Sequence, residues 1–381
     1  MWQAKKRIIC YAREAGGAEA VAPVVEELIK DYDATLLARE MAQTVFEQYQ
    51  LPFLPVEANV RSDTYSFLRE QIKEKPHFLF TSASSLPQND MTDRYLWCWA
   101  RERGVKSMAI LDQWQRYCER FSGLSKNEHM VYLPDKIGIM DEYAREEMIK
   151  LGFHPDILAV TGQPSFDRLR KYSESKMFKR KRVTVRKHVG AENDEKTIIV
   201  VFVSEKIRRG VLKSELNYDE TKVILALIKQ LRRVVVNDKQ KRIWLVIKPH
   251  PNNNTEDFSS IPFGSNGKLV VQLSPSDLPG RELIEGADLV IGMSSVLLVE
   301  SAIIGVPVVS AQIGSSYNKL CVLSAQGYIP FVNSDSEMGI LVRRLLYDTD
   351  FRKHYLKRQT GFCYHKDAVK NVKTEIDRMM E

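Results

Sequence analysis

The sequence predicts an α/β protein in which two parallel-sheet domains face each other across a cleft. Short apolar runs alternate with amphipathic stretches along the chain, which is the pattern of βαβ units whose helices cover both faces of a sheet. This pattern stops after Val160 and begins again at Thr197. At about 150 residues per domain, a chain of 381 residues is long enough for two such domains.

The first half is expected to form one complete sheet. Its apolar runs predict strands at residues 7–11, 34–38, 78–81, 107–111, 136–140 and 157–160. Apolar residues three or four positions apart predict helices at residues 18–30, 42–49, 64–74, 93–103 and 142–151. The N-terminal domain is therefore expected to span residues 1–167.

The second half repeats the alternation. It predicts strands at residues 198–204, 243–248, 269–273, 288–292 and 306–311, and helices at residues 219–236, 282–286 and 295–304. We expect a C-terminal domain over residues 197–350. Residues 351–381 predict helices only, and we expect these helices to pack back towards the first domain.

Residues 168–196 lose the apolar periodicity and are predicted as a basic linker or insert. The chain holds 56 Lys and Arg against 49 Asp and Glu, and seven of the basic residues lie in the acid-free segment Lys176–His188, so the rest is balanced. Local basicity predicts contact with an anionic membrane surface or acidic acceptor. The alternatives are a solvated loop and a nucleic-acid-binding module, which is disfavoured because only Phe178 interleaves the charges.

Cysteine spacing and hydropathy limit the class of protein further. The five cysteines are scattered and show no zinc-ligand spacing, so we expect neither a disulfide framework nor a metal site. No apolar run reaches the roughly 20 residues that span a bilayer, and the N-terminus lacks a signal-peptide pattern. We expect a cytoplasmic protein that can lie peripherally on the inner face of the membrane.

Loops that follow strands carry the candidate site, because ligands of doubly wound sheets bind at the carboxyl ends of the strands. After the first predicted strand, Arg13, Glu14, Gly16 and Gly17 precede a helix. Paired glycines let a backbone approach a ligand closely, and a helix N-terminus offers free N–H groups. A plain tight turn is the alternative.

Asp112 ends another predicted strand and is followed by Trp114, Arg116 and Arg120. A carboxylate at this position suits a general base, whereas the aromatic ring and the two arginines suit an anionic acceptor. The same pattern fits a structural role, in which Asp112 caps the next helix and Trp114 packs inside.

Polar residues also follow two strands of the second half. Lys248, His250 and Pro251 come directly after a strand, and the ammonium and imidazole groups can bind phosphate oxygens. Further on, Ser294 and Ser295 open a helix whose free N–H groups suit a phosphate.

Glu300 lies on the helix that Ser294 and Ser295 open, where its carboxylate could hold a ribose diol. A serine cap and a surface glutamate are the alternative for this helix. Spacing alone does not separate the two interpretations.

These residues resemble the nucleotide-sugar glycosyltransferases of GT-B architecture. His250 and Pro251, with the serine pair in a second Rossmann-like half, are similar to the HP and SS motifs of CMP-sugar sialyl- and Kdo transferases. The layout is also similar to UDP-N-acetylglucosamine 2-epimerase, whose Ser-Gly-Gly-x-x-Glu-Glu helix holds the nucleotide. Residues 161–169, TGQPSFDRL, resemble that enzyme's interdomain TGN segment and part of the CDP-glycerol phosphotransferases. Val296 and Val299 depart from the epimerase helix, and its N-terminal GTRPE-like signature is missing.

The resemblance implies two Rossmann-like domains, with the acceptor in the first and the nucleotide-sugar donor in the second. It implies a catalytic set in which Asp112 or Glu14 is the base and His250 contacts the donor phosphate. The other donor contacts that we expect are Gly16, Gly17, Ser204, Glu205, Lys248, Pro251, Ser294, Ser295 and Glu300. The acceptor contacts that we expect are Arg13, Trp114, Arg116 and Arg120.

The predicted function is metal-independent transfer of a sugar from a nucleotide-activated donor, CMP-linked in preference to UDP-linked, to a glycan or lipid-linked acceptor. Such a reaction belongs to surface polysaccharide or glycoconjugate biosynthesis and uses no cofactor besides its nucleotide-sugar substrate. The alternatives are an isomerase like UDP-N-acetylglucosamine 2-epimerase, a CDP-glycerol-type phosphotransferase and a non-catalytic nucleic-acid-binding module.

Overall fold

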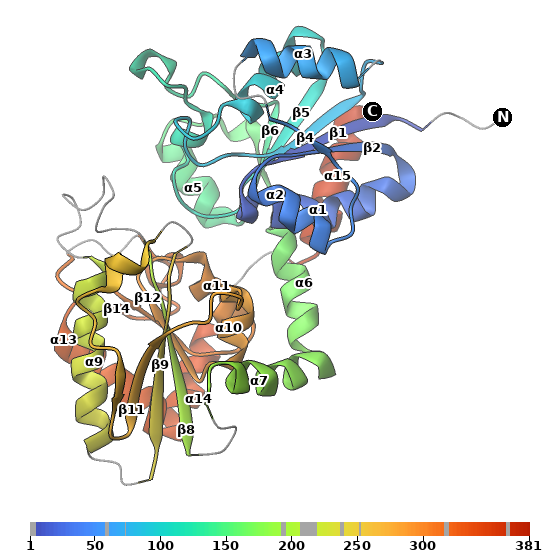
Figure 1. Ribbon diagram of the computed structural model, residues 1–381. Coiled ribbons are helices and arrows are strands. Elements are labelled where there is room, and N and C mark those ends of the chain that lie inside the picture. The colour runs from blue at the N-terminus through green and yellow to red at the C-terminus, as the bar shows by residue number, and fades with distance from the viewer. Residues whose placement is uncertain are drawn as a thin grey trace. The chain divides into compact units, whose positions relative to one another are not determined.

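The chain forms two compact α/β units. A computed structural model describes residues 5–57, 61–72, 74–191, 196–205, 219–236, 240–250, 253–315, 320–362 and 366–381. The first unit comprises Met1–Arg168 with Tyr364–Glu381, and the second comprises Leu169–Cys363. Each unit is a Rossmann-like sheet with helices on its faces, as the alternating apolar pattern predicts (Figure 1). The two-domain α/β prediction is therefore confirmed.

The first unit contains a parallel seven-stranded sheet in the order β3-β2-β1-β4-β5-β6-β7. Its strands are β1 Arg7–Ala12, β2 Asp33–Ala38, β3 Leu54–Pro55, β4 Phe78–Ser82, β5 Lys106–Ile110, β6 Lys136–Ile139 and β7 Leu158–Val160. Its α-helices are α1 Ala15–Asp31, α2 Met41–Gln48, α3 Arg61–Gln71, α4 Thr92–Glu102, α5 Glu142–Lys150 and α15 Ala368–Met380. The short strand β3 was not predicted, because two residues carry no periodicity.

Alternate residues of β1 enter two separate cores. Ile8 and Cys10 pack with α1, α2 and α15, whereas Ile9 and Tyr11 pack with the helices of the opposite face. Successive side chains of a strand point to opposite faces, so a strand that is apolar throughout must be covered on both sides. This burial holds the carboxyl end of β1, and the loop after it, in a fixed place.

The second unit repeats the topology in the order β10-β11-β9-β8-β12-β13-β14, and only the β10–β11 pair is antiparallel. Its strands are β8 Thr197–Val203, β9 Arg242–Lys248, β10 Gly264–Asn266, β11 Leu269–Leu273, β12 Leu289–Gly292, β13 Val308–Ala311 and β14 Phe331–Val332. Its α-helices include α9 Glu220–Val236, α10 Gly280–Gly286, α11 Val296–Ile303, α12 Val322–Ala325, α13 Asp335–Tyr347 and α14 Thr349–Gln359. Short 3₁₀ turns lie at Glu119–Phe121, Lys126–Glu128, Pro155–Ile157 and Thr255–Phe258.

The basic segment is helical, which corrects the prediction of a linker over residues 168–196. Helix α6, Pro164–Ser173, is followed by α7, Lys176–His188, which packs against α10. Arg182 and Arg186 bind the carboxylate of Asp288 at 2.6 and 2.9 Å. The helix was missed because its contacts run through guanidinium groups rather than through a periodic apolar face.

Three of the seven basic residues of α7 therefore form ion pairs with carboxylates of the second unit. Lys181 forms an ion pair with Glu282 at 2.7 Å, in addition to the two arginines on Asp288. The exposed basic residues of the segment are Lys176, Lys179, Arg180 and Lys187. Contact with an anionic surface, which stays a proposal, would depend on these four charges rather than on seven.

Replacing Asp288 with Asn should destabilise the second unit by about 2–3 kcal/mol, because two guanidinium groups and the N–H of Ile199 lose a charged acceptor. Denaturant unfolding measures this loss. The matched control replaces the exposed Lys179 and Arg180 with Gln and should change stability by less than about 0.5 kcal/mol. Equal effects of the two changes would mean that α7 is not fastened through Asp288.

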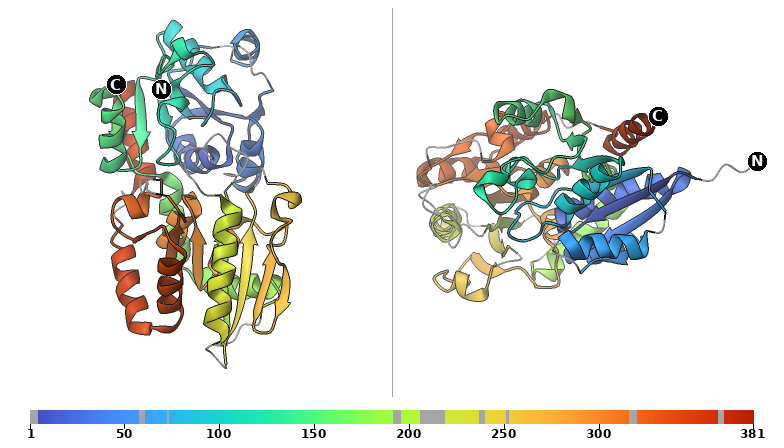
Figure 2. Two further views of the ribbon diagram at one scale, coloured as in Figure 1. Left: turned by 90° about the vertical axis from the view of Figure 1, so that its left-hand side faces the viewer. Right: turned by 90° about the horizontal axis from the view of Figure 1, so that it is seen from above.

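The C-terminal helices divide between the units, which corrects the prediction that all of residues 351–381 pack on the first domain. Helix α14 belongs to the second unit, where Tyr355 donates to the carbonyl of Val308 at 2.6 Å and α13 packs against α9 and α14 (Figure 2). Helix α15 alone joins the first unit, where Val372 and Ile376 enter the core beside α1. Among the described helices, none is both long and apolar enough to span a membrane.

Candidate functional site

Each sheet has a point at which its strand order reverses, between β1 and β4 in the first unit and between β8 and β12 in the second. The loops after these strands diverge there and leave room for a ligand at the carboxyl edge of the sheet. Most of the predicted site residues lie in these loops or in the loop after a neighbouring strand. The structure therefore groups them into two candidate sites, one in each unit.

In the first unit, a glutamate and a serine meet across the reversal point. Glu14 precedes α1, and Ser85 lies in the loop after β4. The backbone N–H and the hydroxyl of Ser85 donate to Glu14 Oε1 at 3.2 and 2.8 Å. Glu14 therefore joins the loops that follow β1 and β4.

The second unit repeats this contact with different residues. Glu205 follows β8 and Ser294 follows β12, and the backbone N–H and hydroxyl of Ser294 donate to the Glu205 carboxylate at 2.6 and 2.7 Å. Burial raises the pKa of Glu205 above its ordinary value, while the hydrogen bonds from Ser294 oppose that shift. In both units, then, a glutamate after the first strand binds a serine after the neighbouring strand on the other side of the reversal point.

The Glu205 contact changes the expected roles of the serine pair. Ser294 was predicted to bind a phosphate, but its N–H and hydroxyl already serve the Glu205 carboxylate. Ser295 caps α11, with its hydroxyl oxygen accepting the N–H of Leu297 at 3.3 Å. Neighbouring Ser204 is buried. A phosphate at this helix N-terminus would have to displace Glu205.

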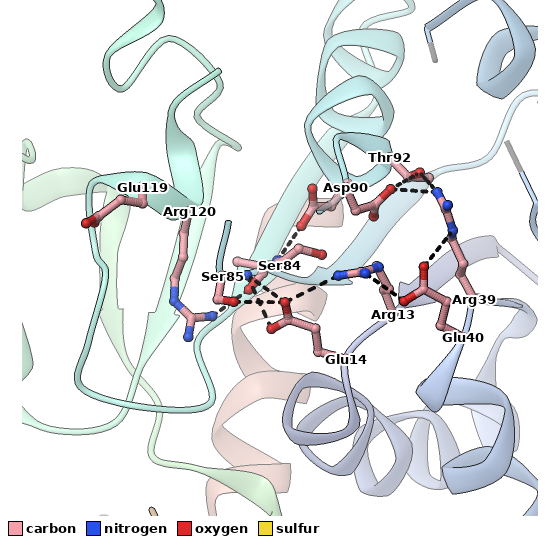
Figure 3. A network of polar contacts seen from close by, with 12 residues as sticks. Arg13, Glu14, Arg39, Glu40, Ser84, Ser85, Asp90, Thr92, Glu119 and Arg120 are labelled. Atoms are coloured by element: carbon pink, nitrogen blue, oxygen red, sulfur yellow. Dashed lines mark hydrogen bonds and ion pairs between the residues drawn. The ribbon is translucent and has the colours of Figure 1, made fainter. Parts of the chain in front are cut away.

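A chain of alternating charges extends from the first site (Figure 3). Arg13 pairs with Glu40 at 2.6 Å, and Arg39 pairs with the fully buried carboxylate of Asp90 at 2.8 Å. Burial by itself would lower the pKa of Arg13, but the neighbouring carboxylates, Glu40 above all, outweigh burial and raise it. Arg13 was predicted to bind an acceptor, but the protein itself pairs its guanidinium. Arg39 and Glu40 were missed, although their position directly after β2 is the signal that could have identified them.

Asp112 lies against the start of α1. Its carboxylate is 2.9 Å from the guanidinium of Arg120, and a Cβ added to Gly16 would overlap with its Oδ2 atom. Gly17 is equally confined, since a Cβ there would come within 2.6 Å of Ser82. Neither glycine has a positive φ, so both are required for close packing rather than for a turn. The helix-cap alternative for Asp112 is wrong, because the next helical turn begins only at Glu119.

The predicted acceptor residues of this loop are mostly internal. The side chain of Arg120 is only 1% exposed, so it cannot bind an acceptor directly. The indole N–H of Trp114 donates to both carboxylate oxygens of Asp141 at 3.0 Å, and its ring stacks on Phe166. Arg116, with a φ of 58°, is exposed. Of these three side chains, only Arg116 is exposed to solvent.

In the second unit Lys248 is the last residue of β9, and His250 follows the strand. The Lys248 ammonium donates to the carbonyl of Leu278 at 2.7 Å, and its burial lowers its pKa. The backbone N–H of His250 donates to Asn253 Oδ1 at 3.0 Å. Pro251, the second residue of the predicted His-Pro motif, lies outside the described residues.

Glu300 is neither a surface glutamate nor an open ribose ligand. Its carboxylate, which is 5% exposed, binds Arg281 through two hydrogen bonds of 2.5 and 3.2 Å. Sequence analysis missed Arg281, because a partner 19 positions away leaves no periodic signal. Within the residues that the structure describes, no three His, Cys, Asp or Glu side chains gather as a metal ion would require.

Comparison with known proteins establishes the fold. No family model matches the chain, and no curated protein matches it. Among solved structures, a Listeria monocytogenes protein assigned as a UDP-N-acetylglucosamine 2-epimerase matches with a TM-score of 0.68 at 14% identity, over 99% of this chain and 97% of that one. The Neisseria meningitidis UDP-GlcNAc 2-epimerase, bound to UDP-GlcNAc, matches with a TM-score of 0.66 at 14% identity, over 98% and 99%.

A glycosyltransferase shares the fold as well. The glycotransferase of kitacinnamycin matches with a TM-score of 0.58 at 12% identity, over 99% of this chain and all of that one. At identities this low the likeness shows a shared architecture of two Rossmann-like domains. That architecture is the one that the His-Pro and Ser-Ser motifs implied.

Proposed function

We propose that the chain is an enzyme that acts on a nucleotide sugar. Full-length likeness to 2-epimerases, one of which was solved with UDP-GlcNAc bound, is the observation that carries this proposal. The second unit would bind the nucleotide, with Lys248 and His250 beside its phosphates and the serine pair reached once Glu205 moves away. In the first unit, Asp112 would transfer a proton, with Glu14 as the second carboxylate.

The favoured reaction is epimerisation of a UDP-sugar at C2. Inversion at C2 requires a base that removes the C2 proton while the C1–O bond to UDP breaks, so that the electron pair forms a C1–C2 double bond. An acid must then return a proton to the opposite face of C2 while UDP adds back at C1. The first unit offers two carboxylates at one sheet edge. UDP now takes precedence over the CMP suggested by the sequence motifs, because the solved relatives with a bound nucleotide hold UDP or a UDP-sugar.

Glycosyl transfer is the second candidate. Val296 and Val299 replace a glycine and a glutamate of the epimerase helix, and a glycosyltransferase shares the full-length fold. In this reaction Asp112 would deprotonate an acceptor hydroxyl instead of a sugar carbon. The two reactions differ in one requirement, since only transfer needs an acceptor.

Nucleotide binding is tested by thermal shift with CMP, CDP, UDP, UMP and GDP. We expect UDP to stabilise the protein most, by about 2.7 kcal/mol at a hundred times its Kd. UDP-GlcNAc alone in deuterated buffer should then gain deuterium at C2, as followed by proton NMR. If UDP-GlcNAc gains no deuterium and is consumed only when a glycan acceptor is added, the result favours glycosyl transfer. No response to any nucleotide would overturn both candidates.

A further inference from the structure

The loops after β4 and β5 are fastened together by two buried arginines. Arg94 uses all five of its N–H donors, each in a hydrogen bond to the protein. These bonds reach the carbonyl oxygens of Ser84, Asp90, Glu119 and Ser122 and the carboxylate of Asp93, at 2.7 to 3.3 Å. Arg94 by itself therefore joins the two loops, without any contact to Asp112.

Arg120 has a different set of partners. Its Nη1 donates to the carbonyl of Ala83 at 2.5 Å and its Nε to the carbonyl of Gln115 at 3.2 Å, so the guanidinium is anchored on both loops. The remaining nitrogen, Nη2, lies 2.9 Å from Asp112 Oδ1. Within the described residues neither of these two buried atoms makes a hydrogen bond, so the contact is an ion pair. A guanidinium that is anchored by its other nitrogens can hold a carboxylate in place through charge at this short distance.

The opposite side of the Asp112 carboxylate meets the first turn of α1. Since a Cβ at Gly16 would overlap with Oδ2, only glycine leaves room for the carboxylate there. Asp112 is thus confined between Arg120 on one oxygen and the backbone of Gly16 on the other. The side chain of Asp112 is 11% exposed and that of Arg120 is 1% exposed, so of the two only Asp112 can meet a substrate.

We propose that Arg120 is a positioning residue that holds the Asp112 carboxylate in its reactive position. Gly16 leaves the space that the carboxylate needs in this position. The inference rests on the proposed function, in which Asp112 is the residue that touches the substrate. It replaces the sequence-based expectation that Arg120 binds an acceptor. A displacement of about 1 Å in a reacting group can reduce turnover about a hundredfold, so a residue that only sets geometry can have an effect of that size.

The experiment compares Arg120→Met, Arg120→Lys, Asp112→Asn and the double variant with Met at 120 and Asn at 112. We expect Arg120→Met to reduce turnover about a hundredfold with the Kd for UDP unchanged, and Arg120→Lys to recover part of the rate. In the Asp112→Asn background the same Arg120→Met change should cost no further turnover, because Arg120 acts through Asp112 alone. Full additivity of the two changes would overturn the proposal.

Crystal structures of the Arg120→Met and Arg120→Lys variants give a readout that does not depend on activity. We expect the Asp112 carboxylate to leave Gly16 in the Met variant and to stay beside it in the Lys variant. An unmoved Asp112 in the Met variant would overturn the positioning role. If the wild type binds no nucleotide and turns over no nucleotide sugar, the proposed function fails, while these two structures still decide whether Arg120 places Asp112. Arg94 joins the same loops independently, so both variants should fold.

Discussion

Replacing Asp112 with Asn should reduce turnover of the nucleotide sugar by about 10²- to 10⁴-fold, the usual contribution of a general acid or base. The amide keeps the size of the side chain but cannot take up a proton. Nucleotide affinity should stay within about twofold, because Lys248, His250 and Ser295 all belong to the other unit. Steady-state kinetics and calorimetric titration with UDP measure the two quantities separately.

Asp141→Asn is the matched control. Asp141 is a carboxylate at the same edge of the same sheet, but it caps α5 and accepts the indole N–H of Trp114. Its replacement should lower stability and leave turnover of the folded protein nearly unchanged. If Asp112→Asn keeps full activity and Glu14→Gln removes it, the base is Glu14 and the assignment of Asp112 is wrong.

Replacing Glu205 with Gln should tighten UDP binding by about tenfold, which corresponds to about 1.4 kcal/mol. In the wild type the Glu205 carboxylate occupies the N–H and hydroxyl of Ser294 that a phosphate would use. Two anions cannot share these donors, so nucleotide binding must first release Glu205. The neutral amide competes less and does not repel the phosphate charge. Calorimetric titration of both proteins with UDP at one pH measures the difference.

The same pair of proteins should differ in their response to pH. Because burial raises the pKa of Glu205, the carboxylate begins to take up a proton above its ordinary pKa as the pH falls. A protonated Glu205 carries no charge, so wild-type affinity should rise relative to that of Glu205→Gln as the pH falls from neutral towards the raised pKa of Glu205. Taking the ratio of the two affinities removes the titration of the phosphate and of every group that the two proteins share.

Glu14→Gln is the control for this second prediction. Glu14 makes the same kind of contact in the first unit, with the N–H and hydroxyl of Ser85. Its replacement should leave UDP affinity unchanged if the nucleotide binds to the second unit. Tightening by Glu14→Gln instead of Glu205→Gln would place the nucleotide in the first unit.

Most of the fold could be predicted from the sequence, because long elements carry their own periodicity. The helix at α1 and the strand at β8 agree with prediction to within a few residues. The strands β3 and β14 escaped prediction because each has two residues, and pairing with a neighbouring strand rather than local pattern defines them. Helix α7 escaped because it is held by Asp288, about a hundred positions further along the chain.

The candidate site was predictable in outline only. The alternation of strands and helices predicts that candidate ligand-binding loops follow β1, β4, β5, β8, β9 and β12. Which polar side chains in these loops are open to a ligand did not follow. Glu300 and Arg120 were both predicted to contact a ligand. Arg281 already binds the Glu300 carboxylate, and Arg120 is buried.

The sequence by itself determined where most of the long helices and strands form and at which edge of each sheet polar loops gather, because hydropathic period is a property of neighbours in the chain. Only the tertiary structure decided the partner of each charge. Glu205 and Ser294 lie 89 positions apart, and the strength of their contact depends on distance and burial that exist only after β8 and β12 pair. The same reason separates a buried Arg120 from an exposed Arg116, although both follow the same strand.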